Sequence, residues 1–120
     1  MDKFLLVGFG NCVPGREDEY HDWYDNRHLD DVLAIGGFVK GQRFAVRDTK
    51  VAGDSNSPWR YLALFEIETA DLRGALDTLV ARSGTELMPS SETVDLNSVA
   101  TFIYRPITPK VEPKGQAPWT

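Results

Sequence analysis

The order of strand-like and helix-like segments constrains the fold of this chain more than any other feature. Residues 4–9 form a short apolar run, which is consistent with a buried strand. Helical periodicity follows over 16–33 and again over 70–82. Alternating side chains predict three further strands, at 38–47, 60–68 and 98–105. The chain is therefore expected to run strand, helix, strand, strand, helix, strand.

This element order, βαββαβ, is that of a ferredoxin-like split βαβ fold. It predicts an α+β domain in which one four-stranded antiparallel sheet carries both helices on one face. The other face would present Leu, Val and Phe side chains to water, which is unfavourable for a lone subunit. Two such faces pressed together would remove that cost. The pattern therefore predicts a homodimer that forms through the sheet face.

The ends of the two helices are predicted from capping residues. A turn at 11–15 precedes the first helix, with Gly15 as its expected N-cap. The first turn is acidic, which suits the positive end of a helix dipole: Glu17, Asp18 and Glu19. Gly36 and Gly37 are expected to stop this helix. Thr69 is the expected N-cap of the second helix.

Length and charge narrow the class of protein. At 120 residues the chain is expected to form one domain, at 1–105. A proline-rich tail follows at 106–120. In this tail, Val111 and Trp119 are candidates to dock on a partner subunit. A net charge of −5 argues against nucleic acid and membrane partners, which select basic surfaces. The sole cysteine excludes an internal disulfide. No apolar run approaches the roughly 20 residues of a membrane span, so a cytoplasmic protein is expected.

The first helix carries more aromatic and polar chemistry than an element that only fills a core would need. At about 100° per residue, one face holds Tyr20, Trp23, Tyr24 and Arg27, with His28 at its edge. The opposite face is polar and is expected to meet solvent: Asp18, Asp22, Asn26 and Asp30. We expect the aromatic face to lie against the sheet.

His28 is the leading candidate for a catalytic residue. One turn from Tyr24, its ring could reach a space between helix and sheet and move a proton near neutral pH. The alternative is a core histidine held by a backbone carbonyl or a carboxylate, and helix position alone does not separate the two. Tyr20 and Trp23, with Tyr24, could hold a flat apolar ligand, although aromatic residues at helical spacing more often fill a core.

The strands add candidate ligand contacts. Arg43 and Arg60 could neutralise a carboxylate or enolate on a ligand, although strand arginines are mostly solvated or ion-paired. Tyr61 and Phe65 share one side of the strand at 60–68 by alternation and are predicted to contact the ligand.

Three residues of the first helix have a spacing that would also suit a metal site. His21, Asp25 and His28 stand at i, i+4 and i+7, a spacing that puts them close to one face. No fourth ligand is evident, and His21 is expected to point toward the acidic, solvated side. A surface pair between His21 and Asp25 is the expected outcome. We therefore predict no metal and no bound cofactor.

Several short motifs occur together in and beside the first helix: Pro14-Gly15-Arg16-Glu17-Asp18-Glu19-Tyr20, Trp23-Tyr24, His28-Leu29, Asp31-Val32-Leu33 and Gly37-Phe38. This set resembles the EthD-like branch of the dimeric α+β barrel superfamily. The likeness covers nearly the whole chain in element order, and the first helix is its specific part. Relatives commonly have a proline where this chain has Gly36. The resemblance implies two ferredoxin-like subunits paired through their sheets into an α+β barrel, with a ligand pocket between helices and sheet.

The resemblance admits several activities, because members include cofactor-free monooxygenases, lactone isomerases, polyketide cyclases and dehydratases, and haem enzymes. The leading hypothesis is a small cofactor-independent enzyme of the isomerase, dehydratase or lyase type, acting on an aromatic, lactone or polyketide-like metabolite. His28 would be its acid–base group and Tyr24 a hydrogen-bonding partner. The alternatives are a cofactor-free monooxygenase and a non-catalytic protein that binds a hydrophobic metabolite. Haem binding ranks last, because the chain is half as long as haem-binding relatives.

Overall fold

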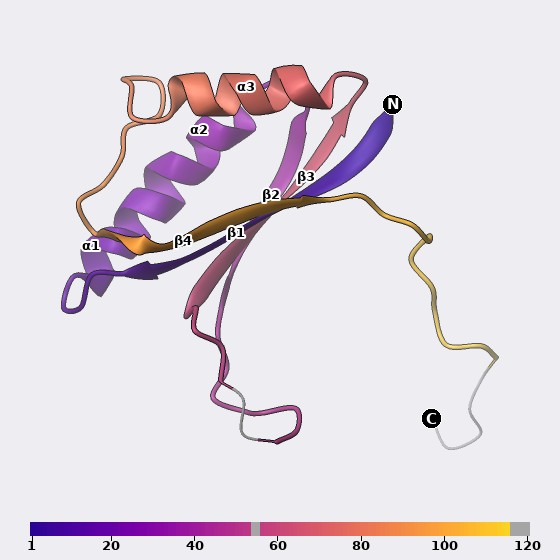
Figure 1. Ribbon diagram of the computed structural model, residues 1–120, viewed down its shortest axis with the longest axis horizontal. Helices are drawn as coiled ribbons and strands as arrows, with labels where there is room; N and C mark the ends of the chain where they lie inside the picture. The colour runs from indigo at the N-terminus through magenta and orange to yellow at the C-terminus, as the bar shows by residue number, and fades with distance from the viewer. Residues whose placement is uncertain (54–55, 116–120) are drawn as a thin grey trace.

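A four-stranded antiparallel sheet forms the base of the structure, and the helices lie along one of its faces (Figure 1). The computed structural model describes residues 1–53 and 56–115. The strands have the spatial order β2-β3-β1-β4, and their bounds are β1 Asp2–Cys12, β2 Phe38–Ala45, β3 Tyr61–Thr69 and β4 Val94–Tyr104. This arrangement confirms the predicted α+β, ferredoxin-like βαββαβ subunit.

Two segments carry the helices. The first passes through α1 (Glu17–Trp23), η1 (Tyr24–His28) and α2 (Leu29–Leu33) without leaving helical backbone angles, and the second is α3 (Leu72–Arg82). η1 is a π-helix, in which the hydrogen bonds span five residues instead of four. The segment predicted as one helix at 16–33 is therefore one element in space, and its middle turn is wider than an α-helical turn.

Two predicted N-caps are wrong. The first helix has Arg16 at its N-cap, and Gly15 instead takes a φ of 84° in the preceding turn. At α3 the N-cap is Asp71, whose carboxylate accepts a hydrogen bond from the backbone N–H of Gly74 at 2.9 Å. Thr69 Oγ1 accepts from the N–H of Asp71 at 3.0 Å, before the helix begins. Thr and Asp are both good caps, so the path of the backbone decides between them.

β1 and β4 extend beyond their apolar runs. Asp2 pairs with Thr69 at one end of β1, and Cys12 pairs with Val94 at the other. These ends are held because a neighbouring strand supplies hydrogen-bond partners for the backbone. Strand length in this sheet thus depends on the neighbour as well as on the side-chain pattern.

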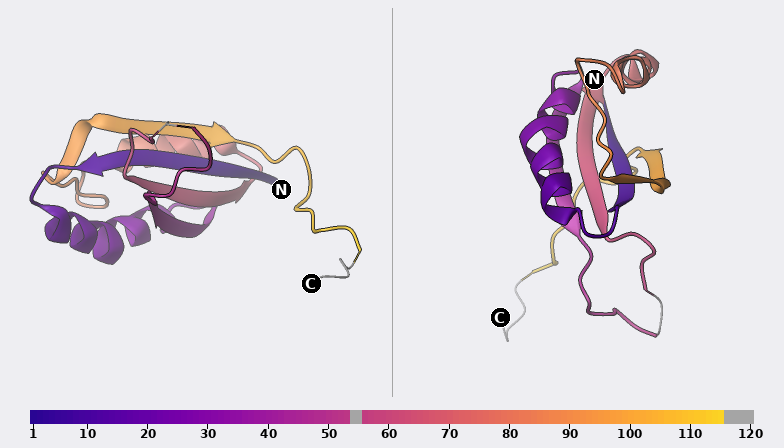
Figure 2. Two further views of the ribbon diagram at one scale, coloured as in Figure 1. Left: turned by 90° about the horizontal axis from the view of Figure 1, so that it is seen from below. Right: turned by 90° about the vertical axis from the view of Figure 1, so that its left-hand side faces the viewer.

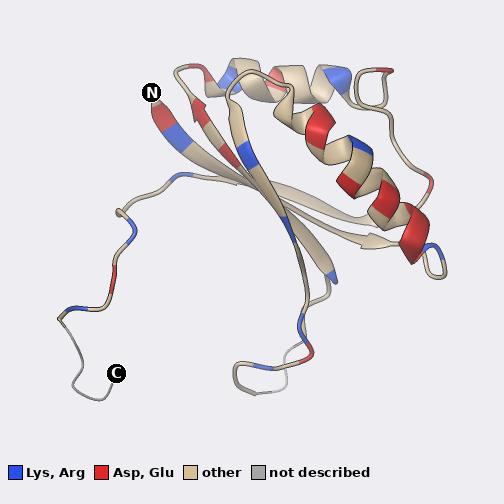
Figure 3. Cartoon of the chain, turned by 180° about the vertical axis from the view of Figure 1, so that it is seen from behind, with Lys and Arg blue, Asp and Glu red and all other residues tan. Residues whose placement is uncertain are grey.

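The hydrophobic core fills the space between the sheet and the helices. Its buried members come from every layer: Leu6, Ala63, Phe65 and Ile67 from the central strands, Phe38 from β2, Val32 and Ile35 from the first helical segment and its exit, Ala75 from α3 and Met88 from the loop that follows. The first helix turns its acidic face outward, as predicted (Figure 3). The face that it turns toward the sheet is the aromatic one, with Tyr20 buried.

The sheet face opposite the helices is uncovered in this subunit, and we call it the open face. Alternation along the strands assigns it Leu5, Val7, Phe9, Phe44, Leu62, Leu64, Phe102 and Tyr104. Phe102 and Tyr104 are 46% and 55% exposed. Trp59 stacks on Phe9 with 4.5 Å between ring centroids, and Phe9 meets Phe102 edge-on at 6.3 Å. The predicted dimer would bury this surface.

Two further expectations concern the outside of the molecule. Residues 106–115 leave the sheet as a chain without helix or strand (Figure 2). Val111 in this segment is exposed, and Trp119 lies outside the described residues. Within 1–53 and 56–115, no helix is long and apolar enough to cross a membrane.

Candidate functional site

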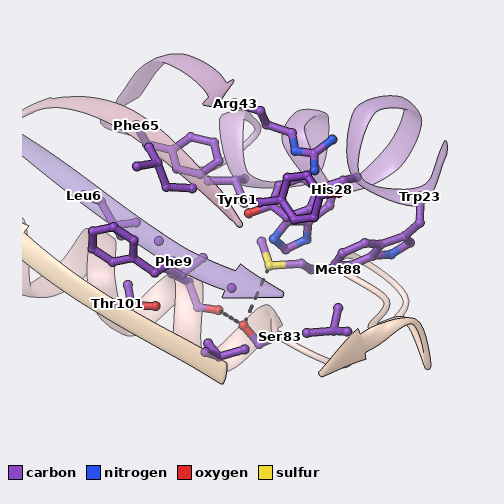
Figure 4. Close-up of a pocket in the computed structure, with 18 of the residues that line it drawn as sticks. Leu6, Phe9, Trp23, His28, Arg43, Tyr61, Phe65, Ser83, Met88 and Thr101 are labelled. Atoms are coloured by element: carbon purple, nitrogen blue, oxygen red, sulfur yellow. Dashed lines mark hydrogen bonds between the residues drawn. The ribbon is translucent and has the colours of Figure 1, made fainter. Parts of the chain in front are cut away.

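A cavity of about 260 Å³ lies between the first helix, α3 and the sheet (Figure 4). Its walls are mostly apolar and aromatic, as those of small-molecule sites commonly are. The structure brings together all seven residues predicted from the sequence to bind or act on a ligand: Tyr20, Trp23, Tyr24, His28, Arg43, Tyr61 and Phe65. Their individual roles remain predictions.

Two glycines of β1 leave room for the cavity. Gly8 and Gly10 follow Leu6 at alternate positions, so they share its helix-facing side. Neither has a side chain to fill the space, and both line the cavity. A Cβ atom at Gly10 would lie 3.9 Å from the Tyr20 hydroxyl, an ordinary contact distance. These glycines are not among the predicted site residues, although glycine inside a strand often marks a close approach by a ligand.

The His28 ring packs against aromatic side chains of its own helix. Tyr24 and His28 are the first and last residues of the π turn. His28 stacks on Trp23, with 4.6 Å between ring centroids and 23° between ring planes. It meets the Tyr24 ring edge-on at 5.0 Å. His28 therefore lies on the aromatic face and not at its edge.

The His28 side chain is half-buried, and its Nδ1 atom is fully buried. Its Nδ1 atom has no hydrogen-bond partner among the described residues, although a histidine that only completes a core would be expected to have one. Burial lowers the pKa of His28, the Asp31 carboxylate opposes this, and the Arg43 guanidinium adds to it. The ring is therefore mostly uncharged at pH 7 and able to accept a proton.

The two tyrosines beside His28 keep their hydroxyl protons, and Trp23 is held by a hydrogen bond. Burial raises the pKa of Tyr24 to about 12, and burial also raises the pKa of Tyr20, with Arg43 opposing the rise. Both hydroxyls therefore keep their protons at neutral pH and remain hydrogen-bond donors. The Trp23 indole N–H donates to the backbone carbonyl of Pro89 at 3.1 Å. This bond ties the wall of the cavity to the loop after α3.

Arg43 lies at the β2 end of the cavity, among three tyrosine rings. Its guanidinium carbon is 4.3 Å from the centre of the Tyr24 ring, 5.3 Å from that of Tyr20 and 5.8 Å from that of Tyr61. A guanidinium at such distances is attracted to the negative face of an aromatic ring. The side chain is only 13% exposed. Arg43 is thus held in place and is not a solvated strand arginine.

The expected surface pair between His21 and Asp25 is wrong. Both instead contact Arg43 Nη1, Asp25 through Oδ1 at 2.6 Å and His21 through Nδ1 at 3.2 Å. Arginine only donates hydrogen bonds, so His21 Nδ1 accepts and the ring proton lies on Nε2. His21 also packs edge-on against Tyr61 at 5.0 Å, so it does not face the solvated side. In the described part of the chain, no three His, Cys, Asp or Glu side chains are placed to hold a metal ion.

Comparisons with known proteins agree on the fold. No family model and no curated protein matches the sequence. Among solved structures, an EthD family protein from Bacillus halodurans aligns with a TM-score of 0.50 and 10% identity, over 89% of this chain and 100% of that chain. The chain has an EthD-like fold.

Two further solved structures have the same subunit fold. SnoaB, a cofactor-independent oxygenase from Streptomyces nogalater, aligns with a TM-score of 0.58 and 16% identity, over 93% of this chain and 100% of its own. A protein proposed to be a monooxygenase, from Shewanella loihica, aligns with a TM-score of 0.57 and 16% identity, over 90% of this chain and 97% of its own. At these identities the likeness shows a shared α+β fold and does not by itself assign a reaction.

The cavity is also lined by residues that the sequence patterns did not predict. They come from α3, the following loop and β4: Leu79, Ser83, Met88 and Thr101. Ser83 Oγ donates to the carbonyl of Leu79 at 2.8 Å and contacts the Met88 sulfur at 3.7 Å. No motif marks these residues, because only the packing of α3 across the sheet brings them to the site. Arg60, the second arginine considered, is exposed and does not line the cavity.

Proposed function

We propose that the protein is a small enzyme that works without a bound cofactor and transfers protons on a flat, apolar metabolite of the aromatic, lactone or polyketide-like class. His28 removes and returns the proton, and Tyr24 hydrogen-bonds to the substrate. The ring system is held by Tyr20, Trp23, Tyr61 and Phe65. One observation carries the proposal: the buried Nδ1 of His28 has no hydrogen-bond partner among the described residues.

This nitrogen supports a catalytic role for a physical reason. A buried polar atom without a partner costs free energy, so such atoms are few and call for an explanation. Nδ1 has less than 1 Å² of accessible surface in this structure, so the proposal requires the ring to shift toward the cavity when a substrate group bonds to this atom. The lowered pKa of His28 fits the same role, because it keeps the imidazole unprotonated and ready to act as a base near neutral pH.

The chemistry this supports is proton transfer next to a carbonyl group. His28 takes a proton from the acidic carbon, and the electrons of that C–H bond pass into the substrate as an enolate. The imidazolium then returns the proton to the same or another carbon of the substrate. No electron acceptor is needed, so the scheme covers isomerisation and the proton transfers of dehydration or lyase reactions.

The elementary step is testable before the natural substrate is identified. We expect the wild-type protein to accelerate exchange of the acidic C–H protons of 2-tetralone with D₂O, followed by NMR. His28→Gln should lower the catalysed rate by at least about 100-fold, since a positioned acid–base group contributes on the order of 10² to 10⁴. Asp30→Asn, on the exposed face of the same helix, serves as the matched control and should leave the rate unchanged.

Two results would contradict this assignment. One is an undiminished exchange rate in a folded His28→Gln protein, which would remove His28 from the chemistry. The other is wild-type protein that binds a flat aromatic probe but catalyses no exchange. That outcome would favour the non-catalytic alternative, in which the protein binds a hydrophobic metabolite.

A cofactor-free oxygenase is the second candidate. It is favoured by SnoaB, a cofactor-independent oxygenase with the same fold, together with the mostly apolar cavity. Here the anion formed by His28 reacts directly with O₂, a CH₂ group becomes a carbonyl, and the second oxygen atom leaves as water. An oxygen electrode separates the two candidates. Uptake of O₂ in step with conversion of 2-tetralone supports the oxygenase, and exchange without uptake supports proton transfer alone.

The proposal includes a homodimer that forms through the open face. It is supported by the exposed apolar side chains on that face, which two copies would cover. The resemblance of the first helix to the EthD-like branch of the dimeric α+β barrels also supports it. The cavity lies on the other side of the sheet, so each subunit keeps its own site.

A further inference from the structure

The lining of the cavity carries charge of one sign only. Among the described residues that line it, Arg43 is the only one with a formal charge once His28 is neutral. Its ion-pair partner, Asp25, lies outside this cavity, in an adjoining hollow, and is 54% exposed. The lining of the cavity thus contains a cation and no carboxylate, while Asp25 pairs with that cation from outside. Such a site favours a ligand that carries a negative charge.

The guanidinium has capacity for another acceptor. An arginine fork has five N–H donors. Nη1 serves both Asp25 and His21, and the guanidinium also hydrogen-bonds to the Tyr20 side chain, so donors remain for one more acceptor. The three tyrosine rings that surround Arg43 keep it in position and reduce its contact with water. A charge-assisted hydrogen bond to an arginine fork is stronger than a neutral one, and partial burial protects it from screening by salt.

We propose that the ligand is a flat, apolar acid whose carboxylate or enolate oxygen pairs with Arg43. This inference rests on the proposed function, because it specifies the class of molecule on which His28 acts. Asp25 and His21 hold the guanidinium from outside the cavity. Asp25 also offsets part of the positive charge, and so it competes with the ligand for Arg43.

The alternative is that Arg43 only ties β2 to the first helix. The two readings differ for a matched pair of probes, 2-naphthoate and 2-naphthamide, which have nearly the same shape and differ in charge. By calorimetry, the wild-type protein should bind 2-naphthoate at least about tenfold more tightly than 2-naphthamide. Arg43→Met should reduce 2-naphthoate to the affinity of the amide and leave 2-naphthamide unchanged. Arg43→Lys should retain part of the preference.

Removal of Asp25 gives the opposite change. Asp25→Asn leaves the charge of Arg43 available to the ligand, so we expect 2-naphthoate to bind several-fold more tightly and 2-naphthamide to bind as before. The matched controls are Arg73→Met and Asp77→Asn. These residues form an exposed ion pair on α3, with 2.9 Å between Nε and Oδ1. Neither control should change either affinity.

Three outcomes would overturn the proposal. The first is no measurable binding of 2-naphthoate to the wild-type protein, and the second is equal binding of the acid and the amide. The third is that Arg43→Met weakens both probes alike, as a structural role requires. His28→Gln separates this inference from the proposed function. It should lower the catalysed exchange rate by at least about 100-fold yet retain the preference for the acid, so each statement can fail without the other.

Discussion

At the scale of single residues, His28 combines properties that rarely occur together. It is half-buried, it stacks on Trp23 and meets Tyr24 edge-on, and its buried Nδ1 lacks a partner among the described residues. An unsatisfied buried polar group costs about 1–3 kcal/mol. Periodicity in the sequence was sufficient to group His28 with Trp23 and Tyr24, because helical spacing is nearly fixed. It was insufficient to predict the π turn or the contacts of the ring, because helical spacing alone reveals neither.

The burial of His28 makes stability depend on pH. Its pKa in the folded protein lies below the unfolded value of about 6.5, so the unfolded chain binds the proton more readily. The stability that this histidine contributes is fully present above about pH 6.5 and is lost as pH falls through the folded pKa. We expect urea titrations between about pH 7.5 and about pH 5 to give a steeper fall in unfolding free energy for wild type than for His28→Gln. The same dependence of unfolding free energy on pH in both proteins would contradict a lowered pKa of His28 in the folded protein.

At the scale of elements, the sequence predicted the pattern of strands and helices but not the details that depend on neighbours. Alternation and helical periodicity were enough for the element order. The N-cap of α3 was assigned to Thr69 and is Asp71, because both residue types cap helices and the backbone path decides. His21 was assigned to the solvated side, and its contact with Arg43 comes from β2, far along the chain. Contacts between elements are what single-sequence patterns miss.

β1 provides a prediction at this scale. Gly8→Val should place two methyl groups in the cavity and weaken binding of 2-naphthoate by at least about tenfold. The free energy of unfolding should not fall, because glycine within a strand is disfavoured by roughly 0.5–1 kcal/mol and the cavity has room for the added atoms. Calorimetry and urea titration measure the two effects. If a folded Gly8→Val protein bound 2-naphthoate as tightly as wild type, Gly8 would not line the ligand site.

At the scale of the whole molecule, solved structures with 10–16% sequence identity to this chain have the same fold. Element order and the side-chain pattern therefore carry the architecture, and few individual residues are needed to specify it. The same pattern leaves an apolar surface on the open face. A lone subunit would expose that surface to water, which favours association.

The dimer is testable by mass. Light scattering after size-exclusion chromatography should give twice the 13.4 kDa of one chain. Phe102→Glu puts a charge at a half-exposed position of the open face and should shift the protein toward monomer, because burying an unpaired charge is costly. Val80→Glu, on the outer surface of α3, where Val80 is 71% exposed, is the control and should remain dimeric. A wild-type protein that is monomeric at micromolar concentration would refute the dimer.

β1 separates two surfaces by the thickness of one backbone. Leu6, Gly8 and Gly10 point toward the helices, while Val7 and Phe9 point to the open face. The side chains at even-numbered positions are therefore constrained by the cavity, and those at odd-numbered positions by whatever packs on the open face. An inserted residue would exchange the two sets at once.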